Sequence, residues 1–566
     1  MAALAALLSV LSLAASWAVY SWYSLFQHYC VARKVNVPLR LLPISHGNPF
    51  WMIVDRKVLR VVKRLLPWTR NSNFIRYNWR GWEVDERCKA HLEMGDVFMH
   101  VTPGGNSLHI CNPDSLIEIF KRRSDFPRPL QIFELLNVFG PNLSTVEGHQ
   151  WKKQRKMTAT CFNERNNQLV WLETISQAAD MIRYWSSKTE VRSTAEDTRT
   201  LSLHVLSRAG FGKSFSFQSQ QEQQATAASS STDLAMNYRA SLQLVLDNCV
   251  LIMALGTRFL AKPWLPKKLR RVHEACVSFQ QYMTDLYEQE KRLNISKSVN
   301  ERGRDSNLMT ALVQASADTQ QDSLLSSDGL SEKEIYGNMF VFNFAGHDTT
   351  AHTLTFIFSF LAANPVVQDW LNEEILQVFG ERCSREAEWD YNADFPRLKR
   401  CLAVLMETVR LYTPVPVAKW TGSSAQTLKV NDKTIVIPPG TMVLPSYSAI
   451  HTHPRFWGPD PLVWRPSRWI IDSSEGEELM VPDRGTFISW SEGERSCPGK
   501  KFSQVEVVAA LATVLREWKV EPVKRHNESI TDARSRLLHQ IENDSAQVLL
   551  LQMLHPERAP LVWRKR

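Results

Sequence analysis

The chain has 566 residues and a mass of 65.0 kDa, with 44% hydrophobic and 22% charged residues, which excludes a disordered, collagen-like or polytopic membrane protein. Its 67 basic and 58 acidic residues give a net charge of +9 without a dominant basic block, so nucleic acid is a poorer partner than an anionic membrane or an acidic protein. Nine scattered cysteines without a CxxC pair argue against a disulfide framework or zinc site and favour a reducing compartment.

The first predicted element is a membrane anchor over residues 1–30. Ala2 to Tyr20 contains no charged residue and would span ~28 Å as a helix, which is enough to cross a bilayer core. Aromatic residues from Trp17 onward suit the interface, and basic residues beginning at Arg33 place the rest of the chain in the cytosol. The alternative is a cleaved signal peptide, but the basic start and the small residues at a cleavage site are missing.

Residues 31–70 are predicted to form a basic segment close to the membrane. Between Trp51 and Leu66, apolar and basic residues alternate with the spacing of an amphipathic helix lying among lipid headgroups. A half-buried surface helix fits the pattern equally well.

Residues 71–566 are predicted to form one large domain, mainly α with small β-sheets (α+β). The clearest helix begins at Ser331, which forms a capping box with Glu334, and continues to Ala363 before Pro365 stops it. We expect further helices over 396–412 and Pro498–Trp518, strands near 97–110 and 416–445, and polar loops over 217–232, 294–306 and 316–330.

Two motifs lie on predicted helices in the first two thirds of the chain. Trp151 and Arg155 are four residues apart and share a helix face. In the long apolar helix, Asp348 and Thr349 are costly to bury unless they are paired, hydrated or functional. Gly346 costs ~1 kcal/mol relative to alanine in a helix, which indicates that something approaches the backbone closely there.

The third motif is Glu407 with Arg410, three residues apart on one helix face. Taken alone it is a common surface ion pair.

The fourth motif is the most specific and spans residues 490–499 (WSEGERSCPG). Cys497 directly precedes a helix that Pro498 can open, so the helix N-terminus is expected to lower the thiol pKa and make it a good metal ligand. Gly493 and Gly499 leave room for a flat cofactor against the backbone, and Arg495 offers a charged fork for a carboxylate.

Together and in this order, the motifs resemble those of the cytochrome P-450 family of heme-thiolate monooxygenases, over roughly residues 40–560. The match includes WxxxR at 151–155, AGxDT at 345–349, ExxR at 407–410, PxRW at 466–469 and GxRxCxG at 493–499. Trp490 departs from the phenylalanine usual in the family, and we expect it to pack beside the ligand. The sequence is similar to microsomal, fungal members, which implies a single-pass protein of the endoplasmic reticulum.

The resemblance implies roles for individual residues. Cys497 would be the axial ligand of the iron of heme b, with Gly493, Gly499 and Trp490 around it, while Asp348 and Thr349 would relay protons to dioxygen. His347, the variable position of its motif, is interpreted as a structural or solvent-facing residue. The heme propionates would be held by Trp151, Arg155 and Arg495, and the cysteine loop would be braced by an ion network of Glu407, Arg410 and Arg468.

The implied activity is oxidation of a lipophilic small molecule by dioxygen, with electrons from NADPH through a flavoprotein reductase, and with cytochrome b5 as a further candidate donor. Fungal secondary metabolism is the expected setting. Alternatives within the family are a fatty-acid or xenobiotic hydroxylase and a reductase-independent isomerase, which the intact Asp348–Thr349 pair disfavours. A non-catalytic heme carrier is the alternative from another class, and nucleic acid is not an expected partner.

Overall fold

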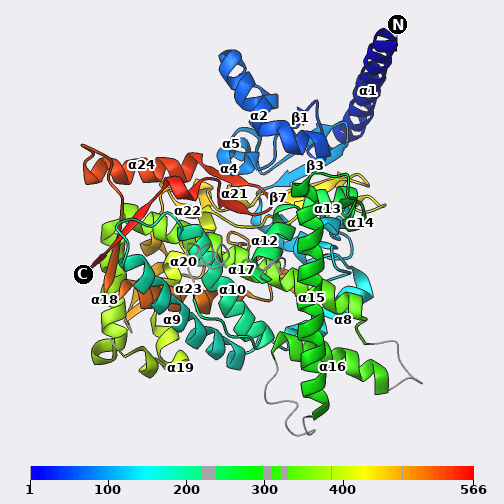
Figure 1. The fold of residues 1–566 in the computed structure, drawn as a ribbon. Coiled ribbons are helices and arrows are strands. Elements are labelled where there is room, and N and C mark those ends of the chain that lie inside the picture. Colours follow the sequence, from blue (N-terminus) through cyan, green and yellow to red (C-terminus); the bar gives the residue numbers. More distant parts are fainter. Residues whose placement is uncertain (1, 218–237, 297–306, 322–328, 384, 475) are drawn as a thin grey trace.

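The structure, a computed structural model, describes residues 2–217, 238–296, 307–321, 329–383, 385–474 and 476–566 (Figure 1). Helices make up most of these residues and the strands form small sheets, which confirms the predicted mainly α class. The predicted polar loop at 217–232 lies outside the described residues except for its first position.

The largest sheet has five strands in the order β1-β2-β3-β7-β4. β2 and β3 form an antiparallel hairpin, and β3 pairs in parallel with β7. β4 closes one edge, and its residues pair with Met442 and Val443. The strands are β1 (Leu39–Leu41), β2 (Val97–Thr102), β3 (Gly105–Ile110), β4 (Lys419–Trp420) and β7 (Met442–Pro445), with a separate hairpin of β5 (Gln426–Val430) and β6 (Lys433–Ile437).

A central helix, α17 (Glu332–Ala363), passes through the helical body (Figure 1). The Ser331 side chain and Glu334 form the predicted capping box, and α18 (Pro365–Phe379) starts at the predicted stop. The helices packed against α17 include α10 (Thr194–Phe211), α20 (Lys399–Leu411) and α23 (Lys500–Leu515), and α9 (Glu164–Ser186) packs against α10 and α23.

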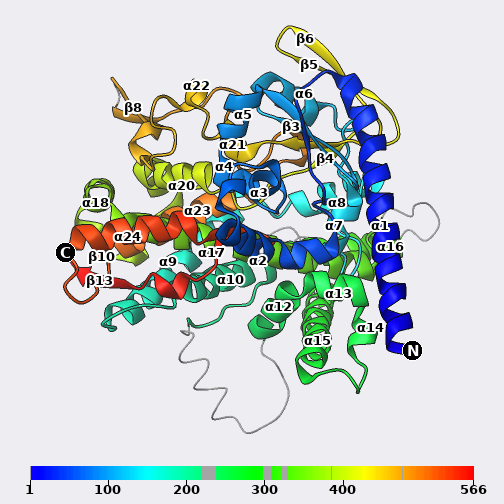
Figure 2. The ribbon, with the colours of Figure 1, turned by 90° about the horizontal axis from the view of Figure 1, so that it is seen from above.

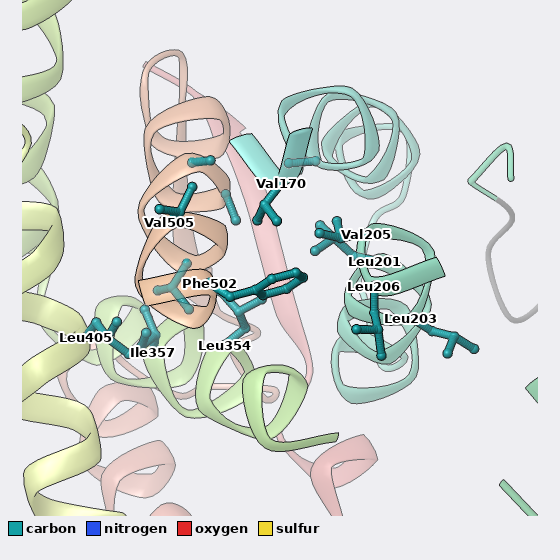
Figure 3. Packing of buried hydrophobic residues seen from close by; sticks show 14 of the residues in the cluster. Val170, Leu201, Leu203, Val205, Leu206, Leu354, Ile357, Leu405, Phe502 and Val505 are labelled. Carbon is teal, nitrogen blue, oxygen red and sulfur yellow. The ribbon is translucent and has the colours of Figure 1, made fainter. Parts of the chain in front are cut away.

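The main core lies between these helices. Phe502 and Val505 of α23 lie in this core together with Val170 of α9, Leu354 of α17 and Val205 of α10 (Figure 3). Because these side chains are almost fully buried, the segment that follows the cysteine loop is anchored in the main core.

The remaining elements fill in around this body. The other helices are α3 (Asn73–Tyr77), α4 (Trp82–Glu86), α5 (Lys89–Met94), α6 (Pro113–Lys121), α7 (Leu130–Phe133), α8 (Gly148–Ala159), α12 (Tyr238–Asp247), α13 (Cys249–Leu255), α14 (Thr257–Leu260), α19 (Tyr391–Asp394), α21 (Tyr447–Ile450), α22 (Pro454–Trp457) and α24 (Ile530–Asn543). The other strands are β8 (Ile470–Ser473), β9 (Gly476–Leu479), β10 (Trp518–Pro522), β11 (Ser545–Gln547), β12 (Leu551–Met553) and β13 (Leu561–Lys565).

Four predicted boundaries were wrong. α15 (Lys267–Ser296) and α16 (Leu308–Gln321) continue into the expected loops at 294–306 and 316–330, because polar composition alone does not end a helix. The rest of 294–306, and 322–328 of the other loop, lie outside the described residues. α23 begins at Lys500 and not at Pro498, and it ends before Trp518, which enters β10 instead.

The N-terminal helix α1 (Ala2–Ala32) extends away from the body, and α2 (Pro49–Leu65) lies on the same side (Figures 1 and 2). Within the described part of the chain, no single helix has the length and hydropathy of a membrane span; α17 and the segment Pro365–Arg382 meet that test only as a pair bent by 109°. α2 is half-buried, since Trp51 and Leu59 are buried while Phe50 and Ile53 are exposed.

Candidate functional site

The cysteine loop is a tight turn fixed by its own backbone. The Cys497 N–H donates to the carbonyl oxygen of Trp490 at 2.8 Å, which closes the loop. Gly493 has a φ of +73°, and a Cβ there would lie 3.1 Å from the carbonyl oxygen of Phe120, so glycine suits both the conformation and the space. The Trp490 indole N–H donates to the Ser503 hydroxyl at 3.2 Å, which ties the loop to α23.

Cys497 is enclosed by protein and yet its side chain is exposed, so it faces open space inside the molecule. A Cβ on Gly499 would lie 3.9 Å from the Cys497 sulfur and 3.8 Å from the Phe162 ring. That ring in turn lies 5.8 Å from the ring of Phe342 on α17, measured between centroids. Phe162 therefore links the cysteine loop to the central helix.

One stripe of α17 also faces open space. Ala345 is exposed and Thr349, one turn later, is half-buried, whereas Phe344 and Thr350 beside them are buried. The Thr349 hydroxyl donates to the Ala345 carbonyl at 2.7 Å. Gly346 does not face this open space but faces α10, because a Cβ there would lie 2.9 Å from a methyl group of Leu206 on that helix. The close approach predicted at Gly346 is thus helix packing.

The ExxR motif forms a buried network that extends beyond the motif. The Glu407 carboxylate accepts two hydrogen bonds from Arg410, at 2.8 and 2.9 Å, and one from Arg468 Nε at 2.9 Å. The Arg465 backbone N–H and the Trp469 indole N–H complete its shell at 2.8 and 2.9 Å. Both side chains of the Glu407–Arg410 pair are fully buried, so it is not the surface pair that the motif alone suggested.

The network connects to the cysteine loop through aromatic rings. Trp469, which donates to Glu407, lies 4.8 Å from Phe487 between ring centroids, and Phe487 lies 6.0 Å from Trp490. Trp490 opens the loop, so the carboxylate of Glu407 is positioned to fix the loop's start.

A cluster of cationic side chains lies on another side of the cysteine. The guanidinium groups of Arg123 and Arg495 each lie 4.5 Å from the ring centroid of Trp151. Arg495 donates to Val146 O and pairs with Glu147 at 2.6 Å, but its Nε and Nη1 are buried without a partner among the described residues. Arg128 Nε is likewise buried and unpartnered there.

This cluster carries more positive charge than the acidic groups around it neutralise. Burial and the neighbouring Arg128 lower the pKa of Arg495 to about 9, and burial with Arg128 and Arg495 lowers the pKa of Lys419 to about 8. Glu147 is the acidic group that acts against these shifts at both residues. Arg128 and Arg155 also interact electrostatically with Cys497.

These observations fit a flat, dianionic cofactor that carries a metal. Two carboxylates would satisfy the unpartnered guanidinium nitrogens and neutralise the cluster, and the exposed Cys497 sulfur would supply a soft ligand. The sequence motifs identified Trp151, Arg155 and Arg495 for this role but not Arg128 or Lys419. Neither residue stands in a recognisable spacing, because the fold brings separate segments together here.

The pKa of Cys497 differs from the sequence-based expectation. Burial raises it above the ordinary value of 9.0, although the Gly499 backbone N–H and the charges of Arg155 and Arg128 act in the opposite direction. The helix N-terminus that was expected to lower the pKa begins three residues later, at Lys500. The Cys497 thiol is therefore expected to lose its proton when the sulfur binds a positively charged group.

Asp348 and Thr349 lie on different sides of α17. Asp348 is buried and pairs with Arg199 of α10 at 3.1 Å, whereas Thr349 lies on the stripe that faces open space. His347 is 3% exposed, so the solvent-facing interpretation of that residue was wrong.

Comparisons with known proteins agree with this geometry. A family model described as cytochrome P-450 matches residues 65–548. A cytochrome P-450 monooxygenase of Arthrobotrys oligospora is 27% identical over 96% of both chains, and one of Penicillium rubens is 29% identical over 89% of both. A monooxygenase of the phomenoic acid biosynthesis cluster of Leptosphaeria maculans is 28% identical, over 90% of this chain and 91% of that protein. A crystal structure of a cytochrome P-450 superposes with a TM-score of 0.62 at 18% identity, over 85% of this chain and 98% of the other.

Proposed function

Because the chain belongs to the cytochrome P-450 family of heme-dependent monooxygenases, we propose that Cys497 would supply the thiolate ligand of its heme b and that the protein oxidises a lipophilic small molecule. Dioxygen is the co-substrate, and NADPH supplies electrons through a flavoprotein reductase, with cytochrome b5 as a further candidate donor. The observation that carries the assignment is an exposed cysteine inside the protein beside buried guanidinium nitrogens without partners.

In this proposal each group of residues has one task. When bound, the heme supplies the activation of dioxygen, with the Cys497 thiolate donating electron density to the iron. Trp151, Arg155 and Arg495, together with Arg128 and Lys419, bind the two propionates. The network of Glu407, Arg410 and Arg468 holds the start of the cysteine loop through Trp469, Phe487 and Trp490.

Replacing Thr349 by alanine tests the oxidative function. The variant should retain heme and bind substrate, but the product formed per NADPH consumed should fall by at least about tenfold, with peroxide or water formed instead. The reason is that a positioned general acid raises the rate of a proton-transfer step by ~10²-fold or more. The Thr349 hydroxyl is the polar group on the exposed stripe of α17. Product, NADPH and peroxide are measured together in a membrane preparation that contains the reductase.

Thr350→Ala is the matched control, because Thr350 is buried and its hydroxyl faces the Gly346 carbonyl. An unchanged product-to-NADPH ratio in Thr349→Ala would contradict the assigned role. Turnover of a peroxide substrate without NADPH would instead indicate the isomerase alternative, and absence of any substrate-dependent NADPH consumption would indicate a heme carrier.

The proposed substrate is a secondary metabolite. The relative from the phomenoic acid biosynthesis cluster supports this setting. The other two relatives are also fungal monooxygenases. A fatty-acid or xenobiotic hydroxylase is the alternative, and product analysis of the purified protein against both compound classes separates the two.

We further propose that residues 1–30 anchor the protein in the endoplasmic reticulum membrane, with 31–70 lying at the membrane surface and 71–566 forming the cytosolic catalytic domain. α1 is free of charged residues, and its exposed side chains include Trp17, Tyr20 and Trp22. α2 exposes Phe50 and Ile53 beside its basic residues, which suits an anionic headgroup layer.

Deletion of residues 1–32 should therefore weaken membrane association, which flotation on vesicles containing anionic lipid measures. The truncated protein should still float at low salt through α2 and be released at high salt, because screening weakens its basic contacts. Equal flotation of the truncated and full-length proteins at high salt would contradict the anchor.

A further inference from the structure

An open groove of about 700 Å³ lies beside α24 and the ribbon of β10 and β13. Four segments line it: the connection between α9 and α10, the residues after β10, the C-terminal half of α24 and the turn before β13. Two of these segments are tied together, because Val191 and Leu561 exchange backbone hydrogen bonds at 2.7 and 2.9 Å. The groove is therefore built on paired backbone and not on a single surface loop.

The side chains that line the groove are mostly polar and carry an excess of positive charge. Five of them are basic and two are acidic. The basic residues are Arg192, Lys524, Arg525, Arg536 and Arg558, and the acidic ones are Glu190 and Asp544. A concave surface lined by one sign of charge attracts ligands of the opposite sign, so the groove favours an anion.

Two of the five basic side chains already have acidic partners. Arg192 pairs with Glu190 at 2.6 Å. Arg536 pairs at 2.7 Å with Glu528, which does not line the groove. Asp544 is the remaining acid, and its carboxylate accepts a hydrogen bond from a backbone N–H at 2.7 Å. Three basic side chains in the groove are thus left with one carboxylate among them.

These three basic side chains are Lys524, Arg525 and Arg558, and all of them are exposed. In the described part of the chain, Lys524 and Arg525 form no ion pair, and Arg558 has only a long contact of 3.9 Å with its neighbour Glu557. Lys524 and Arg525 are adjacent, whereas Arg558 comes from a different segment of the groove. Their hydrogen-bond donors are therefore available to a ligand at two places.

We propose that this groove binds an anion that carries two or more phosphate groups, one at Lys524 and Arg525 and another at Arg558. A guanidinium group donates paired hydrogen bonds to phosphate oxygens, and an ammonium group adds a compact charge. A carboxylate brings one negative charge, whereas each phosphate group brings about two, which matches the excess better. The volume is within the range of roughly 300–1,000 Å³ that small-molecule sites occupy.

The proposed site is separate from the oxidative site. None of the residues assigned to the heme or to oxygen chemistry lines the groove, so the inference goes beyond the proposed function and does not depend on it. α24 lies on the same side of the molecule as α2 (Figures 1 and 2). The headgroup of a multiply phosphorylated lipid is therefore one source of the anion, and a soluble polyphosphate is the other.

The test is calorimetric titration of the full-length, heme-loaded protein in neutral lipid nanodiscs, with pyrophosphate as the probe. Wild type should show saturable binding to one site, and the affinity should fall as salt is added. Lys524→Glu combined with Arg558→Glu should weaken the affinity at least about tenfold, because two attractive charges become repulsive ones. Both side chains are exposed, so the heme content of this variant should equal that of wild type.

Lys429→Glu combined with Lys433→Glu is the matched control. It changes the net charge by the same amount at two exposed positions of the hairpin of β5 and β6, outside the groove, and should keep the wild-type affinity. Absence of saturable pyrophosphate binding to wild type would overturn the proposal. An equal loss of affinity in the two double variants would also overturn it, because it would show attraction to net charge alone.

A second set of nanodiscs distinguishes the two sources of the anion. One kind contains a lipid with a bisphosphorylated inositol headgroup, and the other contains phosphatidylserine at equal total charge. If pyrophosphate binding to wild type is lost only in the discs with the inositol lipid, the lipid headgroup occupies the groove. Any other result in discs assigns the site, once the first titration has shown it, to a soluble polyphosphate.

Discussion

Glu407→Gln is expected to destabilise the protein by about 3–5 kcal/mol and to yield preparations with little bound heme. The Glu407 carboxylate accepts five hydrogen bonds from four residues, and two of those residues, Arg410 and Arg468, donate from their guanidinium groups. A neutral amide would leave the charges of Arg410 and Arg468 buried without a counter-ion, and its NH₂ group would face donors. The measurements are urea unfolding of the detergent-solubilised protein and the ratio of heme to protein.

Two other glutamates provide controls. Glu506 on α23 is fully buried, but burial raises its pKa to about 8, so its carboxyl is neutral at pH 7 and Glu506→Gln should change stability by less than about 1 kcal/mol. Glu373 is 72% exposed and forms a surface pair with Arg400, so Glu373→Gln should also be nearly neutral. If Glu407→Gln were as stable as these controls, the network would not brace the loop.

Cys497→Ala is expected to abolish substrate oxidation and to remove most of the heme. The cationic cluster around Arg495 would still attract the propionates, but no other described cysteine lies in the loop to supply a sulfur ligand. The fold should persist, because α23 is held by Phe502 and Val505 and not by the thiol. Heme content, unfolding midpoint and turnover are measured on the same preparation.

Cys383→Ser is the matched control for this variant. Cys383 is half-buried in a different part of the fold, so its replacement should leave heme content and turnover unchanged. Normal heme content and turnover in Cys497→Ala would mean that another residue binds the iron.

The elements that carry the site follow directly from local sequence. The Ser331–Glu334 capping box, the apolar run to Ala363 and Pro365 predict α17 to within one residue, because each of these signals acts over a few positions. Short-range spacing likewise indicates which residues of the cysteine loop and of the ExxR motif belong together.

The parts that sequence could not provide depend on contacts between distant segments. Arg128 and Lys419 join the cationic cluster only because the segment before α7 and strand β4 meet at that point. The surroundings of His347 are hidden for the same reason, since Arg199 and Glu196 come from α10, about 150 positions earlier. A local pattern also misplaced the start of α23, where Gly499 and not Cys497 precedes the helix.

The most direct test of the account is the absorption spectrum of the reduced, carbon monoxide-bound protein, recorded for wild type, Cys497→His and Cys383→Ser. Thiolate ligation predicts a strongly red-shifted Soret band in wild type and in Cys383→Ser, and its replacement in Cys497→His by the shorter-wavelength band of an imidazole-ligated heme. A wild-type protein without the red-shifted band, or a Cys497→His variant that keeps it, would contradict the assignment of Cys497 as the heme ligand.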